Sequence, residues 1–253
     1  MKKPDMDTSY ETLENAIEHV VVNGPEIYRT LYNNRSHKER ILFELSLVIK
    51  AGRKIVDLGG GVGVHSVVGQ ISGSEFICID NSISKNQRQI DAIKYAESFG
   101  VVFIEEDLLN MELPFEDNSL DAIVTFDCFE HLHHSPRNIY KQLVGKMKKG
   151  GVFVIGCPNA ANILKRIRCL AGKNIWSVLD DWYFSTEFRG HVREPIIEDL
   201  KMIFNDIGLN NHKIYGRNFI GQMKYGNIIN SLSYVLKYLP TLCSNIYIQG
   251  YKP

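Results

Sequence analysis

The stretch that decides the fold is "VDLGGGVGVHS", residues 56–66. An apolar run ends at Asp57, and Gly59, Gly61 and Gly63 follow it. Because glycine carries no Cβ, the backbone at these positions can turn tightly and approach a ligand closely. The stretch therefore predicts a strand, then a turn that binds a ligand, then a helix.

Apolar runs of strand length alternate with helical patterns along the middle of the chain. The runs are rich in Val and Ile, which is typical of strands covered on both faces. We expect strands at 54–59, 75–80, 101–107, 120–127 and 151–158, with helices at 64–71, 84–99 and 136–148. This alternation predicts an α/β fold with a doubly wound, mostly parallel sheet.

Further segments precede and follow this cofactor-binding core, residues 53–158. Residues 1–52 read as a helical N-terminal extension, either a lid or simple packing, with one helix expected to begin at Ser36 as N-cap and to stop at Gly52. We expect the whole chain, 1–253, to form a single domain.

The part after the core completes the sheet. Residues 159–193 are too long for an ordinary loop and form an insertion after the fifth strand. Residues 194–253 contain a predicted helix at 195–207 and two predicted strands, at 210–218 and 244–253.

Composition excludes several classes of protein. The 29 basic residues balance the 29 acidic ones, so we expect no nucleic-acid partner, which would favour a basic excess. The five cysteines are scattered without a CxxC pair, so the sequence suggests no disulfide framework. A reducing compartment, the cytoplasm, is therefore the expected location. The N-terminal stretch lacks the apolar core of a signal peptide, and no apolar run approaches the roughly 18 to 20 residues of a transmembrane segment.

One amphipathic stretch, "NIINSLSYVLKYLP" (227–240), has several interpretations. A lid, a dimer surface and a peripheral membrane contact are three of them. A helix packed on the sheet is the interpretation that we prefer.

Acidic residues end three successive predicted strands. Asp57 precedes the glycines, where its carboxylate would repel a pyrophosphate and attract an ammonium or sulfonium group. Asp80 lies 21 positions after Gly59, where an acid can accept hydrogen bonds from ribose hydroxyls. Asp107 and the backbone of Leu108 are placed to meet an adenine. These acids predict a site for a cationic nucleoside, although turn or helix capping is a simpler role for each.

A dinucleotide site is the competing interpretation of the glycines. Its GxGxxG spacing fits only in a shifted register, at Gly61, Gly63 and Ser66, with serine in the last position. Together with the position of Asp57 before the glycines, this mismatch disfavours a nicotinamide-dependent reductase.

Four segments carry a family resemblance: "VDLGGGVG" (56–63), "ICID" (77–80), "EEDLLNMELPFEDNSLDAIVTFDCFEHL" (105–132) and "MKKGGVFVIGCPN" (147–159). In order and spacing they resemble the motifs of class I S-adenosylmethionine-dependent methyltransferases, in the small-molecule branch that includes the ubiquinone-biosynthesis type. The resemblance implies a Rossmann-like sheet of seven strands, the last antiparallel. It also implies S-adenosyl-L-methionine as cofactor and S-adenosyl-L-homocysteine as product.

The same resemblance implies how the cofactor is bound. The three glycines would pass its methionine part, Asp80 would bind the ribose and Asp107 the adenine. Phe126 and Asp127 would flank the sulfonium end. The implied cofactor-binding residues are Asp57, Gly59, Gly61, Gly63, Asp80, Asn81, Asp107, Leu108, Phe126 and Asp127.

The segment "DCFEHLHHSP" (127–136) follows the fourth predicted strand, where cofactor and acceptor would meet. Its histidines match no zinc-ligand spacing, so we expect no metal. A hydroxyl acceptor must lose its proton, and a neutral imidazole is a suitable base. The pattern "E-x-L-H-H-x-P" resembles small-molecule and sugar methyltransferases in which a histidine lies near the acceptor. Candidate bases are His134 and His133, ahead of His131, and helix capping is the alternative.

The insertion ends in "GHVREP" and resembles methyltransferases of glycan and polysaccharide biosynthesis, in which "PN", a basic stretch and "GH-x-R" occur in that order. We therefore expect a small-molecule or glycan-linked acceptor. The candidate acceptor-binding residues are His191, Arg193, Trp182 and Tyr183. A solvated basic face and an ordinary aromatic core are the alternatives.

The sequence as a whole predicts a cytoplasmic S-adenosylmethionine-dependent methyltransferase that methylates a hydroxyl with help from a histidine. Methylation of nitrogen or carbon on a small metabolite is an alternative for which a base is not required. A non-catalytic S-adenosylmethionine-binding module is another.

Overall fold

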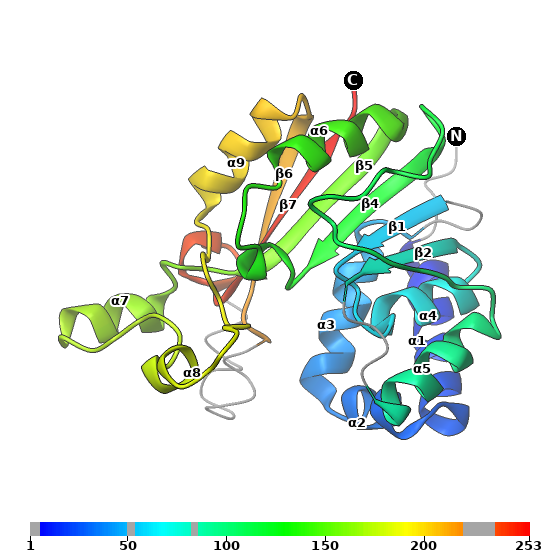
Figure 1. The fold of residues 1–253 in the computed structure, drawn as a ribbon, viewed down its shortest axis with the longest axis horizontal. Helices are drawn as coiled ribbons and strands as arrows, with labels where there is room; N and C mark the ends of the chain where they lie inside the picture. The colour runs from blue at the N-terminus through cyan, green and yellow to red at the C-terminus, as the bar shows by residue number, and fades with distance from the viewer. Residues whose placement is uncertain (1–5, 50–53, 82–85, 220–235) are drawn as a thin grey trace.

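A sheet runs through the centre of the protein, with helices on both of its faces (Figure 1). The computed structural model describes residues 6–49, 54–81, 86–219 and 236–253. In these ranges seven strands form one sheet in the order β3-β2-β1-β4-β5-β7-β6. The strands are β1 (Lys54–Leu58), β2 (Glu75–Asp80), β3 (Val102–Glu105), β4 (Leu120–Phe126), β5 (Met147–Pro158), β6 (Asn210–Arg217) and β7 (Asn245–Tyr251). β7 runs antiparallel to β5 and β6, which confirms the predicted fold class.

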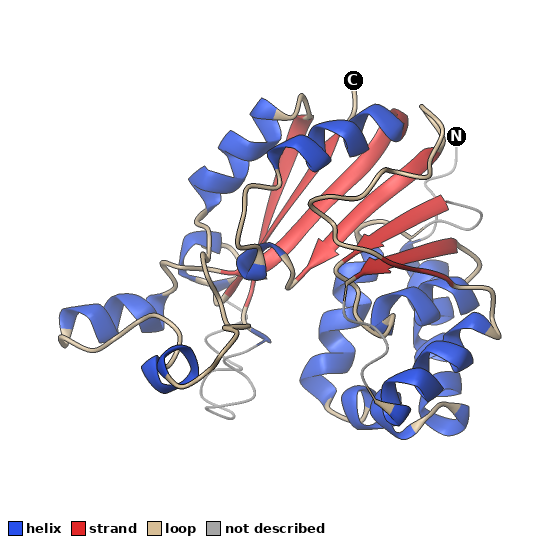
Figure 2. Cartoon of the chain, in the orientation of Figure 1, coloured by secondary structure: helices blue, strands red, loops and turns tan. Residues whose placement is uncertain are grey.

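Both faces of the sheet are buried because successive strand residues point to opposite sides. In β2, Phe76 and Cys78 enter one hydrophobic cluster, whereas Ile77 and Ile79 enter the other. The first face is covered by α1 (Met6–Asn23), α2 (Glu26–Tyr32), α3 (Arg35–Ser46), α4 (Val64–Ile71) and α5 (Gln87–Glu97), and the second by α6 (Arg137–Lys146) and α9 (Ile197–Asp206) (Figure 2). Cover on two faces explains the continuous Val- and Ile-rich runs in the sequence.

The insertion forms two short helices that project beyond the sheet, α7 (Ile163–Leu170) and α8 (Leu179–Tyr183) (Figure 1). α7 begins where the side chain of Asn162 accepts a hydrogen bond from the backbone N–H of Lys165. Neither of these described helices contains a buried residue. Their side chains are therefore available to solvent and to the cavities beside them.

The helix predicted to start at Ser36 begins and ends elsewhere. α3 begins at Arg35, because the side chain of Asn34 accepts hydrogen bonds from the backbone N–H groups of Ser36 and the next residue. It ends at Ser46. The expectation that Ser36 caps this helix and that Gly52 stops it is therefore wrong, and Gly52 itself lies outside the described residues.

Other boundaries differ from the prediction by a few residues. β3 ends at Glu105, and α5 begins after Asn86, whose side chain accepts a hydrogen bond from the helix backbone. β5 begins at Met147, so Met147 and Lys148 belong to a strand rather than to the helix expected at 136–148. The helix expected within 227–240 falls largely outside the described residues, which resume at residue 236.

An ion-pair network joins α3 to the end of β4. Arg40 lies 2.8 Å from a carboxylate oxygen of Glu44 and 2.6 Å from one of Asp127. The fully buried Glu44 also lies 2.6 Å from Nε2 of His65, and it accepts a hydrogen bond from the hydroxyl of Tyr247. Burial alone would raise the pKa of Glu44, but the charges of Arg40 and His65 lower it to about 2. This network favours packing over a lid for α3.

The variant Glu44→Gln tests the network. A matched comparison exists on the same helix, because α3 also carries an exposed ion pair of the same spacing, Arg35 with Glu39. A carboxyl with a lowered pKa contributes stability above its unfolded value of 4.5 and loses it as the pH falls toward about 2. We expect the free energy of unfolding to fall by on the order of 3 kcal/mol over that window, and Glu44→Gln to abolish this part of the loss.

At pH 7, Glu44→Gln should cost roughly 3 to 5 kcal/mol, because it removes the buried carboxylate that Arg40 and His65 share. Glu39→Gln is the matched control and should cost less than about 1 kcal/mol. Urea unfolding at several pH values measures both changes. Equal costs for the two variants would contradict the importance of the buried network.

Candidate active site

The described residues form a cavity of about 670 Å³ at the edge of the sheet where β1, β2 and β4 end. Of the residues predicted to bind the cofactor or to act as a base, it is lined by Gly59, Asp80, Asn81, Asp107, Leu108, Asp127, His131, His133 and His134. The insertion adds Glu187, Phe188 and Arg189. Parallel strands bring their carboxyl ends to one edge, so residues far apart in the sequence meet in one crevice.

The turn after β1 requires a left-handed backbone. Gly59, Gly61 and Gly63 have φ angles of +71°, +56° and +77°, which L side chains rarely adopt. A Cβ at Gly59 would lie only 2.3 Å from Sγ of Cys128. The backbone N–H of Gly61 donates a hydrogen bond to Oδ2 of Asp80 at 3.0 Å. The turn therefore joins the end of β1 to the end of β2.

Four residues predicted to bind the cofactor do not line this cavity: Asp57, Gly61, Gly63 and Phe126. The buried carboxyl of Asp57 accepts a hydrogen bond from Oγ of Ser66 at 2.8 Å, and burial raises the pKa of Asp57. The ring of Phe126 packs against His65 and Tyr247. In the structure these side chains hold α4 and the turn in place, and their contact with a cofactor stays a prediction.

Asp107 lines the cavity and also forms a local turn. It accepts hydrogen bonds from the backbone N–H of Leu109 at 3.0 Å and from the side-chain amide of Asn110 at 2.6 Å. The turn role that the sequence left open is therefore present. It holds the carboxylate beside Leu108 on the cavity wall.

Asp127 has an unusual backbone for a residue with a side chain. Its φ is +50°, and its ion pair with Arg40 ties it to α3. Its second oxygen, Oδ1, is buried and has no hydrogen-bond partner among the described residues. Because an unpaired buried acceptor is costly, this oxygen is suited to accept a hydrogen bond from a ligand.

Two histidines in the loop after β4, His131 and His133, form hydrogen bonds with the backbone of the insertion. Nε2 of His133 lies 3.1 Å from the carbonyl oxygen of Phe188, and Nδ1 of His131 lies 2.9 Å from that of Arg189. A carbonyl oxygen only accepts hydrogen bonds, so each of these ring nitrogens carries the proton. The neutral ring then keeps its lone pair on the other nitrogen, at Nδ1 of His133 and Nε2 of His131.

The predicted acceptor-binding residues are distributed over two further cavities. His191 and Trp182 line a cavity of about 540 Å³ that also contains His133 and Phe188. Arg193 lines a third cavity, of about 590 Å³, between α6 and α9. Tyr183 lines neither of these; it is 68% exposed and packs edge-on against Phe184. The structure thus brings together two of the four predicted residues.

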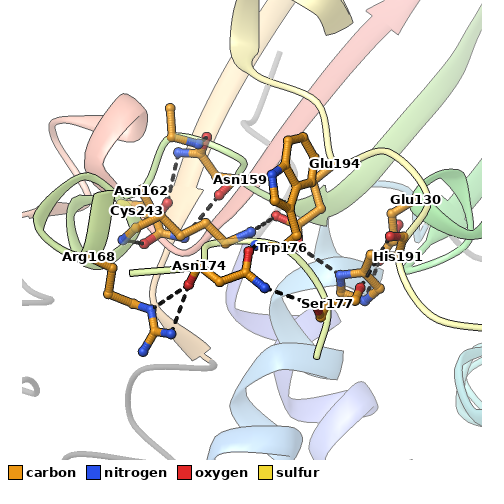
Figure 3. A network of polar contacts seen from close by, with 12 residues as sticks. Glu130, Asn159, Asn162, Arg168, Asn174, Trp176, Ser177, His191, Glu194 and Cys243 are labelled. Carbon is orange, nitrogen blue, oxygen red and sulfur yellow. Dashed lines mark hydrogen bonds and ion pairs between the residues drawn. The ribbon is translucent and has the colours of Figure 1, made fainter. Parts of the chain in front are cut away.

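Two functional candidates escaped the sequence prediction: Arg40 and Glu194. A carboxylate oxygen of Glu194 lies 2.7 Å from Nδ1 of His191, and the two side chains face each other in Figure 3. Glu194 also pairs with Lys165. Glu194 follows His191 by three residues, a local signal that the sequence did contain. Arg40 gives no such signal toward Asp127, because the two residues meet only in the folded chain.

Known proteins resemble this chain in sequence and in fold. Residues 30–214 match a family described as "Methyltransferase domain". Sterol 24-C-methyltransferase ERG6B of Gibberella zeae is 31% identical over 108 residues, which are 42% of this chain and 27% of that protein. An S-adenosylmethionine-dependent methyltransferase of Thermotoga maritima has a TM-score of 0.57 at 19% identity, over 98% of this chain and 100% of that one. Phosphoethanolamine N-methyltransferase 2 of Haemonchus contortus, solved with S-adenosyl-L-methionine, has a TM-score of 0.60 at 14% identity, over 94% and 60%.

The chain belongs to this methyltransferase family, because the family match spans most of its length. The predictions of a class I methyltransferase domain and of S-adenosylmethionine as its cofactor are confirmed. The chain spans only 27% of the length of the curated relative, and the small-molecule branch stays a prediction.

Asp80→Ala tests the predicted ribose contact. A carboxylate that accepts two hydrogen bonds contributes roughly 1.5 to 3 kcal/mol for each, so we expect S-adenosylmethionine to bind at least about 100-fold more weakly. Glu105→Ala is a matched control, since Glu105 is the register partner of Asp80 on β3 and does not line the cavity. Calorimetric titration compares the two, and an unchanged affinity in Asp80→Ala would place the ribose elsewhere.

Proposed function

We propose that the protein transfers a methyl group from S-adenosylmethionine to a hydroxyl of a small-molecule or glycan-type acceptor, with His133 as general base. One observation carries the proposal. His133 lines the cavity that contains Asp80 and Asp127, and it also lines the cavity that contains Trp182 and His191. The first cavity suits the cofactor and the second suits an acceptor, so His133 lies where the two would meet.

The chemistry needs little from the protein beyond alignment and a base. The acceptor oxygen forms a bond to the methyl carbon, the carbon–sulfur bond breaks, and S-adenosylhomocysteine leaves. The hydroxyl proton must pass to a base as this occurs. Because Nε2 of His133 donates to the carbonyl of Phe188, its Nδ1 keeps the lone pair that accepts such a proton. The same hydrogen bond fixes the orientation of the ring.

The composition of the second cavity supports a glycan-type acceptor. Trp176 and Trp182 offer exposed aromatic faces, and Asn174 and Ser177 offer polar groups beside them. Flat apolar rings with a few polar groups between them suit a sugar, whose faces are apolar and whose rim is polar. Nitrogen or carbon methylation of a small metabolite is the alternative outcome of an acceptor screen.

The cytoplasm is the proposed location. The five cysteines form no disulfide, and four of them are buried thiols. Within the described ranges, every helix is too short or too polar to span a bilayer.

The first test is an acceptor screen with radiolabelled S-adenosylmethionine and a panel of nucleotide sugars, lipid-linked glycans and quinol precursors. We expect label in a glycan-type acceptor, on an oxygen. Label on nitrogen or carbon would contradict the O-methylation part of the proposal. Binding of the cofactor without transfer to any acceptor in the panel would favour a non-catalytic module.

His133→Ala then tests the base. Removal of a general base typically costs 100-fold or more, so we expect kcat to fall by about that factor while S-adenosylmethionine still binds. His134→Ala is the matched comparison from the same loop and should retain most of the activity. Full activity in His133→Ala, or its loss in His134→Ala alone, would refute the assignment.

A further inference from the structure

Glu130 is a buried carboxyl that the proposed reaction does not use. Its side chain is 0% exposed, and neither carboxylate oxygen has a hydrogen-bond partner among the described residues. A carboxyl left in this state is costly, since burial of an unpaired charge or of an unsatisfied polar group is unfavourable. Its position therefore calls for a partner.

Two imidazoles face this carboxyl. Nε2 of His191 lies 4.0 Å from Oε1 of Glu130. Figure 3 shows the two side chains next to each other. The ring of His131 lies edge-on to that of His191, with 4.9 Å between the ring centroids. One ligand atom from each of the three side chains lies within 4.8 Å of the other two. Two imidazoles and one carboxylate therefore converge at one point.

Outer hydrogen bonds prepare both imidazoles to act as ligands. Nδ1 of His191 is 2.7 Å from the carboxylate of Glu194, which Lys165 holds in turn. Nδ1 of His131 is 2.9 Å from the carbonyl oxygen of Arg189. In each ring the Nδ1–H is the donor, so Nε2 of the neutral ring is left with a lone pair. Carboxylates and backbone carbonyls that hold Nδ1 in this way are the usual second shell of metal-bound histidines.

The backbone joins the segments that carry the three side chains. The carbonyl oxygen of Glu130 accepts hydrogen bonds from the backbone N–H groups of Val192 at 2.7 Å and Arg193 at 3.3 Å. The loop after β4 and the end of the insertion are therefore fixed against each other. Such a cluster is preorganised before any ligand binds.

We propose that Glu130, His131 and His191 form a binding site for one divalent transition-metal ion of the zinc type. Two imidazoles with one carboxylate are typical of such ions, whereas magnesium and calcium prefer oxygen ligands. Ligands at the usual zinc distances of about 2.0 to 2.2 Å and tetrahedral angles lie about 3.4 Å apart. The ligand atoms now lie 4.0 Å apart between His191 and Glu130 and within 4.8 Å in the cluster as a whole, so side-chain rotations must bring them closer when the ion binds.

The local spacing of the sequence does not contain this set of ligands. His131, His133 and His134 match no zinc pattern among themselves, and the third proposed ligand, His191, comes from the insertion, far along the chain. His191 also lines the cavity proposed for the acceptor, so an ion held there would face that cavity with its open coordination positions. The metal proposal does not depend on the methyl acceptor, because binding of the ion is measured without cofactor and acceptor.

The test uses the full chain without a histidine tag, stripped with a chelator and dialysed. Calorimetric titration with Zn²⁺ should give one saturable site, and Mg²⁺ should bind far more weakly. Co²⁺ should give the visible absorption bands of a site with nitrogen and oxygen ligands. His191→Gln and Glu130→Gln should each weaken Zn²⁺ binding by at least about 100-fold, whereas His133→Gln, from the same loop, should leave it unchanged.

Glu130 is fully buried, so circular dichroism must show that Glu130→Gln is folded before its affinity is compared. The partly exposed His191 gives an independent variant if it is not. The proposal is overturned if the wild type shows no saturable Zn²⁺ site, or if His191→Gln binds Zn²⁺ as tightly as the wild type. A failed acceptor screen would leave these results untouched, so the two proposals fail separately.

Discussion

The parallel direction of β1, β2, β3 and β4 is the constraint on which the site depends. Parallel strands end at one edge of the sheet, so the turns that follow them share one crevice. The glycine turn after β1 keeps a left-handed backbone there, and the N–H of Gly61 bonds to Asp80 at the end of β2. Arg40 adds a contact from outside the sheet, because it pairs with Asp127 after β4. The wall proposed for the cofactor is therefore built from sheet geometry and one buried ion-pair network.

Much of the core could be predicted from the sequence because its signals are local. Strands covered on both faces appear as continuous apolar runs, and the predicted β1, β2, β4 and β5 are present, although β5 begins earlier than expected. The glycines predicted a turn with backbone angles that residues with a Cβ rarely adopt. Asp80, Asp107 and Asp127 were expected at strand ends, and the order of parallel strands then brings all three to one cavity.

The contacts that the sequence could not supply join distant segments. The carbonyls of Phe188 and Arg189 meet His133 and His131 only because the insertion folds back over the loop after β4. The wrong N-cap for α3 also has a physical cause. Asn and Ser are both good N-cap residues, and in the structure the side chain of Asn34 accepts the hydrogen bonds from the first N–H groups of the helix.

The most direct test of this account is a crystal structure of the full chain with S-adenosylhomocysteine bound. The account predicts ribose hydroxyls on Asp80, the adenine beside Asp107 and Leu108, and the sulfur between Asp127 and His133. The sulfur should then face the cavity that contains Trp182 and His191. A nucleoside bound elsewhere, or one whose sulfur faces away from His133, would contradict the proposed meeting point of cofactor and acceptor.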